Sequence, residues 1–98
     1  MHIVAQKTIR EYAAKHPDAA APLWNWFKAT QKAQWKNFSD IRQPFNSVDY
    51  VGNQRYVFNI EHNKHRLVVV IKFTAGMVYI RFVGTHAEYD RIANIETI

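Results

Sequence analysis

Side chains that could act on a phosphate gather in the C-terminal third of this sequence, together with residues that could exchange protons. Arginine binds phosphate through two hydrogen bonds and keeps its charge at any physiological pH. Histidine exchanges protons near neutral pH, which suits it to general acid or base catalysis. The candidates are Arg66, Lys72, Arg81, His86 and Tyr89.

Together, these residue types match the requirements of RNA cleavage without a metal ion. In such a reaction the 2′-OH of the RNA attacks the adjacent phosphorus. The protein need only orient the strand, remove the 2′ proton, stabilise the crowded phosphate and protonate the leaving 5′ oxygen. His86 could transfer protons, or it could bind phosphate or be structural. Tyr89 is a second candidate for proton transfer or base stacking, or it could be a core residue.

Two apolar, β-branched runs must carry the arginines. In the first run, Arg66–Phe73, alternation predicts one purely apolar face. That face consists of Leu67, Val69, Ile71 and Phe73, and the opposite face of Arg66, Val68, Val70 and Lys72. After a turn at Gly76, the second run places Val78, Ile80 and Phe82 on one face, and Met77, Tyr79, Arg81 and Val83 on the other. We therefore expect a hairpin that rests its apolar face on helices and presents its basic face to a partner.

A short helix is expected directly after the hairpin. Thr85 and Glu88 have the spacing of a capping box, so the helix should begin just after Thr85. His86 would then occupy the first helical position, beside unpaired N–H groups that favour a phosphate. Tyr89, three residues further on, would share a face with His86. Asp90 could either orient His86 or stabilise the helix electrostatically.

The remainder of the chain supplies a scaffold. Pro17 should end a first helix, and Asp18 is an acceptable N-cap for a second. The expected elements are a short strand at 2–5, helices at 7–16 and 18–34, and strands at 48–51, 55–60, 66–73 and 77–83. The order β-α-α-β-β-β-α indicates the α+β class: an antiparallel sheet, two N-terminal helices on one face and a short C-terminal helix. The three tryptophans are expected to pack these helices onto the sheet, although Trp24 and Trp35 could contact a partner.

The chain length and amino-acid composition are those of a small globular protein. Its 98 residues predict one domain, 1–98, and a hydrophobic content of 48% argues against disorder. The absence of cysteine excludes a disulfide framework and thiolate metal ligands. No run reaches the ~20 apolar residues of a membrane span, and the N-terminus has no signal-peptide pattern, so we expect a cytoplasmic protein.

Positive charge is concentrated where the sheet is expected. The net charge is +5, and between residues 50 and 85 the only acid is Glu61. The basic residues of that stretch are Arg55, Lys64, Arg66, Lys72 and Arg81. This distribution favours contacts with the phosphates of a nucleic acid.

A histidine metal site is the alternative to metal-independent chemistry, because His62, His65 and His86 could together hold zinc. However, His62 and His65 are three positions apart in a strand–turn region, so alternation directs them to opposite faces. No carboxylate converges on them. We therefore expect neither a metal nor a cofactor.

The motifs in this part of the chain resemble a known family. NKHRLVVVI (63–71) and YIRFVGTHAEYD (79–90) resemble the HigB toxins of bacterial toxin–antitoxin pairs, members of the RelE-like group of small mRNA-cleaving toxins. The resemblance extends through VGNQRYVFNI (51–60) to KHPDA (15–19), and GTHAEYD is its most specific part. It implies a RelE-like fold and an endoribonuclease that cuts mRNA in the ribosomal A site. The implied partner is a HigA-type helix-turn-helix antitoxin.

The resemblance also bears on individual residues. It implies that Arg66 stabilises the transition state, with His86 and Tyr89 as the other catalytic residues. Lys64 and His65, which directly precede Arg66, are expected phosphate contacts, as are Arg55, Lys72 and Arg81. Two alternatives stay open: a non-catalytic module that binds RNA or the ribosome, and a toxin of the same fold with another target, such as gyrase.

Overall fold

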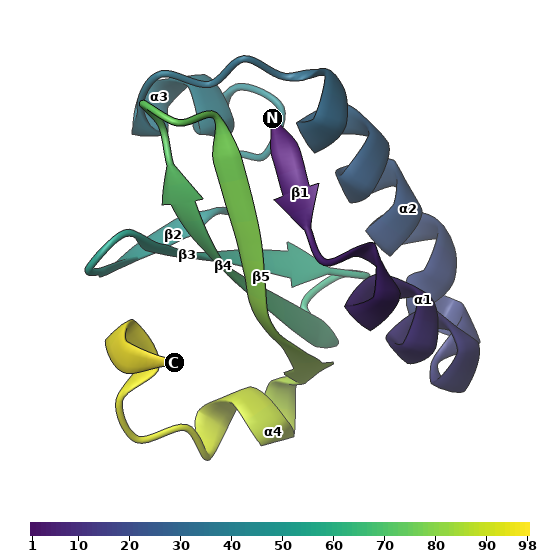
Figure 1. The fold of residues 1–98 in the computed structure, drawn as a ribbon. Helices are drawn as coiled ribbons and strands as arrows, with labels where there is room; N and C mark the ends of the chain where they lie inside the picture. The colour runs from purple at the N-terminus through teal and green to yellow at the C-terminus, as the bar shows by residue number, and fades with distance from the viewer.

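A five-stranded sheet forms the centre of the computed structural model, which describes residues 1–98 (Figure 1). The strand order is β1-β5-β4-β3-β2, so β4 lies in the middle. The strands are β1 (His2–Val4), β2 (Asp49–Gly52), β3 (Arg55–Ile60), β4 (His65–Lys72) and β5 (Met77–Thr85). The pairs from β2 to β5 are antiparallel as expected, whereas β1 adds a parallel edge beside β5. The expected α+β class is confirmed, with a mixed sheet in place of a purely antiparallel one.

Two long helices pack on one face of the sheet, and the shorter ones lie at its margins (Figure 1). The helices are α1 (Gln6–Lys15), α2 (Pro17–Lys32), α3 (Phe38–Arg42) and α4 (His86–Asp90), followed by the 3-10 turn η1 (Ile95–Thr97). Pro17 is the first residue of α2, where its missing N–H costs nothing, and it prevents α1 from continuing. None of these helices combines the length and apolar character needed to cross a membrane.

The core lies between this helical layer and the sheet. Leu67 and Val69 of β4 are fully buried and belong to one cluster with Ile9 of α1 and Leu23 of α2. Burial of such side chains contributes about 1.5 to 3 kcal/mol each. Trp26 and Trp35 are buried in the same cluster, so the packing role expected of the tryptophans is confirmed for these two.

A β-bulge in β5 changes the faces that alternation predicts. Val68 pairs with Phe82, but Val69 pairs with Ile80, so Arg81 is an extra residue in β5. Past this point the expected alternation is wrong. Val83 pairs with Leu67 and packs against the core, whereas Phe82 lies opposite Val68 on the other face. An inserted residue inverts every later side chain, and it also bends the strand.

The sheet face opposite α1 and α2 is also covered, but less completely than the face on which these two helices pack. Val57, Val68 and Val70 point away from the helical core, yet all three are buried. Helix α4 contacts β4 and β5 on this side, and η1 contacts β2. We call this side the open face. It carries Arg66 and Lys72, as alternation along β4 predicts.

Truncation of Leu67 tests the position of the core. Leu67→Ala should lower the free energy of unfolding by about 2 to 5 kcal/mol, because a fully buried side chain leaves a cavity between β4 and the helices. Urea denaturation measures this change, and Lys28→Ala on the exposed side of α2 is the control, expected within about 0.5 kcal/mol of the parent. A loss below 1 kcal/mol for Leu67→Ala would contradict the packing described.

Candidate active site

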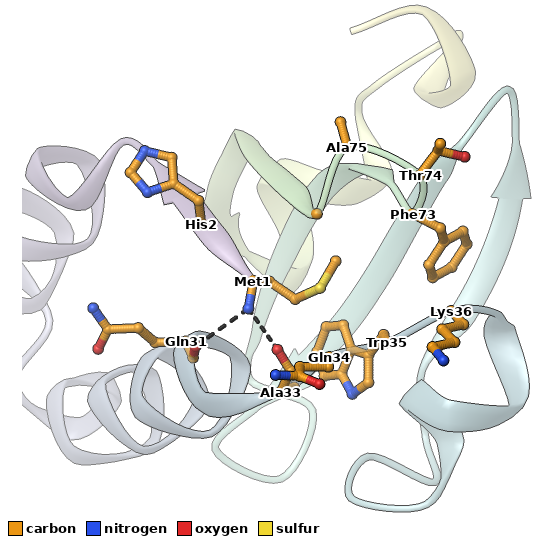
Figure 2. Close-up of a pocket in the computed structure, with 11 residues that line it drawn as sticks. Met1, His2, Gln31, Ala33, Gln34, Trp35, Lys36, Phe73, Thr74 and Ala75 are labelled. Atoms are coloured by element: carbon orange, nitrogen blue, oxygen red, sulfur yellow. Dashed lines mark hydrogen bonds between the residues drawn. The ribbon is translucent and has the colours of Figure 1, made fainter.

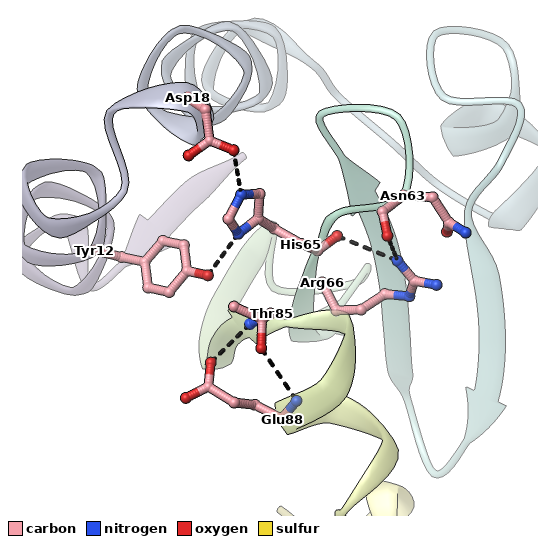
Figure 3. Close-up of polar contacts among 7 residues, drawn as sticks. All are labelled: Tyr12, Asp18, Asn63, His65, Arg66, Thr85 and Glu88. Atoms are coloured by element: carbon pink, nitrogen blue, oxygen red, sulfur yellow. Dashed lines mark hydrogen bonds and ion pairs between the residues drawn. The ribbon is translucent and has the colours of Figure 1, made fainter.

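Arg66 is a nearly buried arginine that no carboxylate neutralises. It is 8% exposed at the start of β4, on the open face. Its Nη1 donates to the main-chain oxygens of Asn63 (2.9 Å) and His65 (3.4 Å), as Figure 3 shows. The two ion pairs of the structure involve other residues. Nε and Nη2 have no acceptor in the protein and are not fully enclosed, so the N–H groups of two guanidinium nitrogens stay available to an anion.

The turn before β4 holds one of these carbonyls in place. Glu61, His62 and Asn63 have φ values of 52°, 50° and 84°, all in the left-handed region. This conformation costs about 1 to 2 kcal/mol per residue outside glycine, with asparagine the least affected. Three such residues in succession are unusual, and strained backbone of this kind clusters at functional sites. Here the turn delivers the Asn63 oxygen to the Arg66 guanidinium.

The ring of Tyr89 in α4 packs against Arg66. The guanidinium carbon lies 5.7 Å from the centre of the tyrosine ring, within the range of a cation–π contact. Burial raises the pKa of Tyr89; Arg66 acts in the opposite direction, and the carboxylates of Asp49 and Asp90 raise it further. The phenol therefore keeps its proton through the neutral range and is available as a donor.

Helix α4 begins as the spacing predicts. Thr85 Oγ1 accepts from the Glu88 N–H (3.2 Å), and Glu88 Oε1 accepts from the Thr85 N–H (2.8 Å), which completes the capping box (Figure 3). The His86 N–H donates to the Lys64 main-chain oxygen (2.9 Å). This bond ties the first residue of α4 to the residue before β4. Lys64, Arg66, His86 and Tyr89 therefore come from one corner of the open face.

Asp90 contacts the His86 ring. Its Oδ2 lies 2.8 Å from His86 Nδ1, one helical turn away. The structure therefore contains the contact that an orienting role for Asp90 would require. His86 Nε2 has no partner in the protein, and the side chain is 45% exposed. The imidazole is held at one nitrogen and is free at the other.

His65 lies on the opposite side of the sheet from Arg66. It is 3% exposed, with Nδ1 2.6 Å from the Tyr12 hydroxyl and Nε2 2.8 Å from Asp18 Oδ2 (Figure 3). The expected phosphate contact does not fit this arrangement, because both ring nitrogens are engaged by α1 and α2. Alternation accounts for the difference, since His65 shares the helix-facing side of β4 with Leu67. No three His, Cys, Asp or Glu side chains come together in a way that could hold a metal ion.

Sequence reasoning missed Tyr12 and Asp18, the two partners of His65. Burial, then Glu88 and Asp18, raise the pKa of Tyr12 to about 12, so its hydroxyl stays protonated at neutral pH. That hydroxyl shares a hydrogen bond with His65 Nδ1, and His65 Nε2 bonds Asp18, whose pKa is lowered chiefly by this hydrogen bond. The chain of bonds pins the start of β4 onto both helices.

The remaining basic residues form a separate cluster at the other end of β4. Lys72 lies six residues from Arg66, or about 20 Å at roughly 3.3 Å per residue. A hollow of about 280 Å³ is lined by Arg55, Val70, Lys72, Tyr79 and Arg81. Arg55 and Arg81 both donate to the main-chain oxygen of Ile98, and Lys72 Nζ donates to Gln54 Oε1. We call Arg55, Lys72 and Arg81 the distal basic cluster.

The largest hollow of the structure contains none of the expected site residues. It has a volume of about 540 Å³ and lies between the start of β1, the end of α2 and the β4–β5 turn (Figure 2). Trp35 and Phe73 contribute apolar walls, and the Met1 amino group donates to the oxygens of Gln31 and Ala33. His2 and Lys36 are its only ionisable side chains, so it offers no convergent chemistry.

The Asp18–His65 bond should give stability a definite pH dependence. A lowered pKa in the folded state means that the Asp18 carboxylate favours folding above its unfolded pKa, and that this contribution is lost as the pH falls through the folded pKa. Asp18→Asn should therefore lower the melting temperature at neutral pH. The difference in melting temperature between variant and parent should become smaller as the pH falls. Melting curves across pH test this, with the exposed Glu11→Gln as control. A difference in melting temperature that stays constant with pH would contradict this role of the Asp18 carboxylate.

Known proteins of similar sequence carry related names. The family model described as HigB_toxin, RelE-like toxic component of a toxin–antitoxin system, matches residues 19–92. The mRNA interferase toxin HigB of Escherichia coli K12 is 33% identical over 93 residues, which cover 92% of this chain and 88% of that protein. The mRNA interferase HigB of Shigella flexneri has the same identity and coverage. The mRNA interferase HigB of Escherichia coli O6:H1 is 26% identical over 94 residues, covering 94% and 91%. The chain belongs to the HigB family of RelE-like toxins, the toxic components of toxin–antitoxin systems.

Proposed function

We propose that residues 1–98 form a single toxin domain that cuts mRNA by attack of the RNA's own 2′-OH, without a metal ion or cofactor. The observation that carries this proposal is the buried guanidinium of Arg66, with free donors, packed against Tyr89. His86, in the same short helix as Tyr89, is bonded through its N–H to the residue before β4. The named relatives support it, because all three carry the name mRNA interferase.

Arg66 would stabilise the crowded phosphate. Nε and Nη2 have no acceptor in the protein, and they lie in the planar arrangement that suits two phosphate oxygens. Because the side chain is already desolvated and fixed, it would not need to reorganise as charge develops. A buried, unpaired cation is costly for stability, so its position supports a functional role.

His86 and Tyr89 would move the two protons. The free Nε2 of His86 takes the proton from the 2′-OH, while Asp90 holds Nδ1 and stabilises the resulting imidazolium. O2′ then bonds to phosphorus, the bond from phosphorus to O5′ breaks, and the phenol of Tyr89 protonates O5′. The products are a 2′,3′-cyclic phosphate and a 5′-OH. The raised pKa of Tyr89 supports the donor role, because the phenol is protonated at neutral pH.

The remaining basic residues would bind the RNA strand. Lys64 is exposed beside Arg66, and the distal basic cluster lies further along the same face. His65 is not among them, since we assign it to the support of β4. The site has few fixed acid–base groups, which favours a requirement for the ribosome to position mRNA in the A site. The partner that silences this activity would be a HigA-type antitoxin with a helix-turn-helix domain.

Expression of the parent chain beside Arg66→Ala and His86→Ala tests the proposal. New 5′ ends should appear within translated reading frames, and both variants should lose them. Loss of the phosphate cation should cost about 10²- to 10³-fold in rate, and loss of the proton-transfer group about 10²- to 10⁴-fold. Sequencing of RNA 5′ ends measures the cuts in vivo, and purified variants with programmed ribosomes give the rates.

His2→Ala is the matched histidine control, because His2 is exposed on β1 and distant in the fold from α4. It should cut as the parent does. Arg66→Lys keeps the charge but loses the two-pronged geometry, so most of the loss should persist. Growth arrest with intact mRNA would contradict the nuclease and leave a binder of RNA or the ribosome; DNA damage would point to another target such as gyrase.

A further inference from the structure

The chain beyond α4 turns back over the open face and contacts the distal basic cluster through Ile98. One oxygen, the main-chain oxygen of Ile98, accepts three hydrogen bonds from two guanidiniums. Arg55 donates from Nε (3.2 Å) and Nη2 (2.7 Å), and Arg81 donates from Nε (3.1 Å). Two guanidiniums that converge on one oxygen offer the contacts that a phosphate oxygen would receive.

The cluster carries more positive charge than its present partner balances. None of its three basic side chains forms an ion pair with an Asp or Glu side chain. The hollow beside it is also lined by Tyr79 and contains no acidic residue. Three basic side chains thus lie around a single acceptor oxygen of the main chain. A phosphate offers several oxygens for charge-assisted bonds, which suits it to these guanidiniums.

The segment that occupies the cluster is lightly held. We call Ile95–Ile98 the strap. None of its residues is buried, and its regular structure is the three residues of η1. Besides the arginine contacts, Asn53 Nδ2 donates to the Glu96 oxygen (3.1 Å) and the Thr97 hydroxyl to the Asn94 oxygen (2.8 Å). Segments with few buried contacts open at a small cost in free energy.

We propose that the strap and an RNA phosphate compete for Arg55 and Arg81. In this arrangement the distal basic cluster is a second phosphate subsite, separate from Arg66, and RNA reaches it only when the strap lifts. The inference rests on the proposed RNA-binding function and adds to it a built-in competitor. The strap lowers affinity for RNA as long as it stays closed.

A reversible disulfide tests the competition directly. A Cβ placed on Gly52 would lie 3.8 Å from the Cβ of Glu96, which is the mean Cβ separation of disulfides, about 3.8 Å. The chain contains no cysteine, so Gly52→Cys with Glu96→Cys creates a single lock. The φ of Gly52 is +101°, which strains a cysteine there, and the comparison is therefore between the oxidised and reduced forms of one variant.

Binding of a short fluorescent single-stranded RNA is measured across salt concentrations. The oxidised form should bind at least about tenfold more weakly, and its salt slope should be smaller by about 1.4, because two phosphate contacts are lost at roughly 0.7 each. Reduction should restore both. The single variants Gly52→Cys and Glu96→Cys should not respond to oxidant. Equal affinity and slope in the two forms would overturn the proposal.

A second variant tests the proposal if the disulfide does not form. Asn53 has a φ of 49°, which glycine adopts freely, so Asn53→Gly removes the amide that holds Glu96 and leaves the backbone intact. This variant should bind RNA a few-fold more tightly. Unchanged or weaker binding would overturn the strap. Cleavage is assayed separately. If the disulfide changes RNA binding but neither the parent nor any variant cuts RNA, the competition by the strap is supported and the proposed nuclease activity is contradicted.

Discussion

The structure depends on one costly arrangement, a buried guanidinium without a carboxylate partner. Arg66 is held by two main-chain oxygens and by the ring of Tyr89. One oxygen comes from Asn63, at the end of a left-handed turn, and the other from His65, which two helices pin in place. In the proposed mechanism, an arginine fixed in this way would already be in place for a phosphate. The protein gives up stability at this point, and preorganised charge is what it gains.

In the proposed site, one face of β4 supports the strand and the other carries the residue that would act on phosphate. His65, on the helix side, is bonded to α1 and α2, so the strand cannot shift along them. Arg66, one residue later, faces away from them. The bond from His86 to the Lys64 oxygen then brings α4 to the same corner. Neighbouring residues of one strand therefore serve opposite purposes, and the small sheet can carry a site directly against its core.

Local patterns predicted much of this arrangement, and long-range pairing accounts for the rest. Pro17 and the capping box at Thr85 act within a single turn of chain, so the sequence alone was sufficient to place them. The partners of His65 lie 53 and 47 residues away, beyond the reach of any local pattern. Alternation along β4 does place His65 on the same face as Leu67. This pattern is the sequence signal that predicts the position of His65 on the helix side. The bulge at Arg81 and the parallel edge strand depend on tertiary register, which no short motif fixes.

The central claim is that the RNA supplies its own nucleophile and that Arg66, His86 and Tyr89 only assist it. The direct test replaces one nucleotide, at a cleaved position of an mRNA bound to ribosomes, by its 2′-deoxy form. The account predicts that cleavage stops at that position and that neighbouring ribonucleotide sites are cut as before, with 2′,3′-cyclic phosphate ends. Cleavage at the 2′-deoxy position would contradict it, because the nucleophile would then have to be water or a side chain.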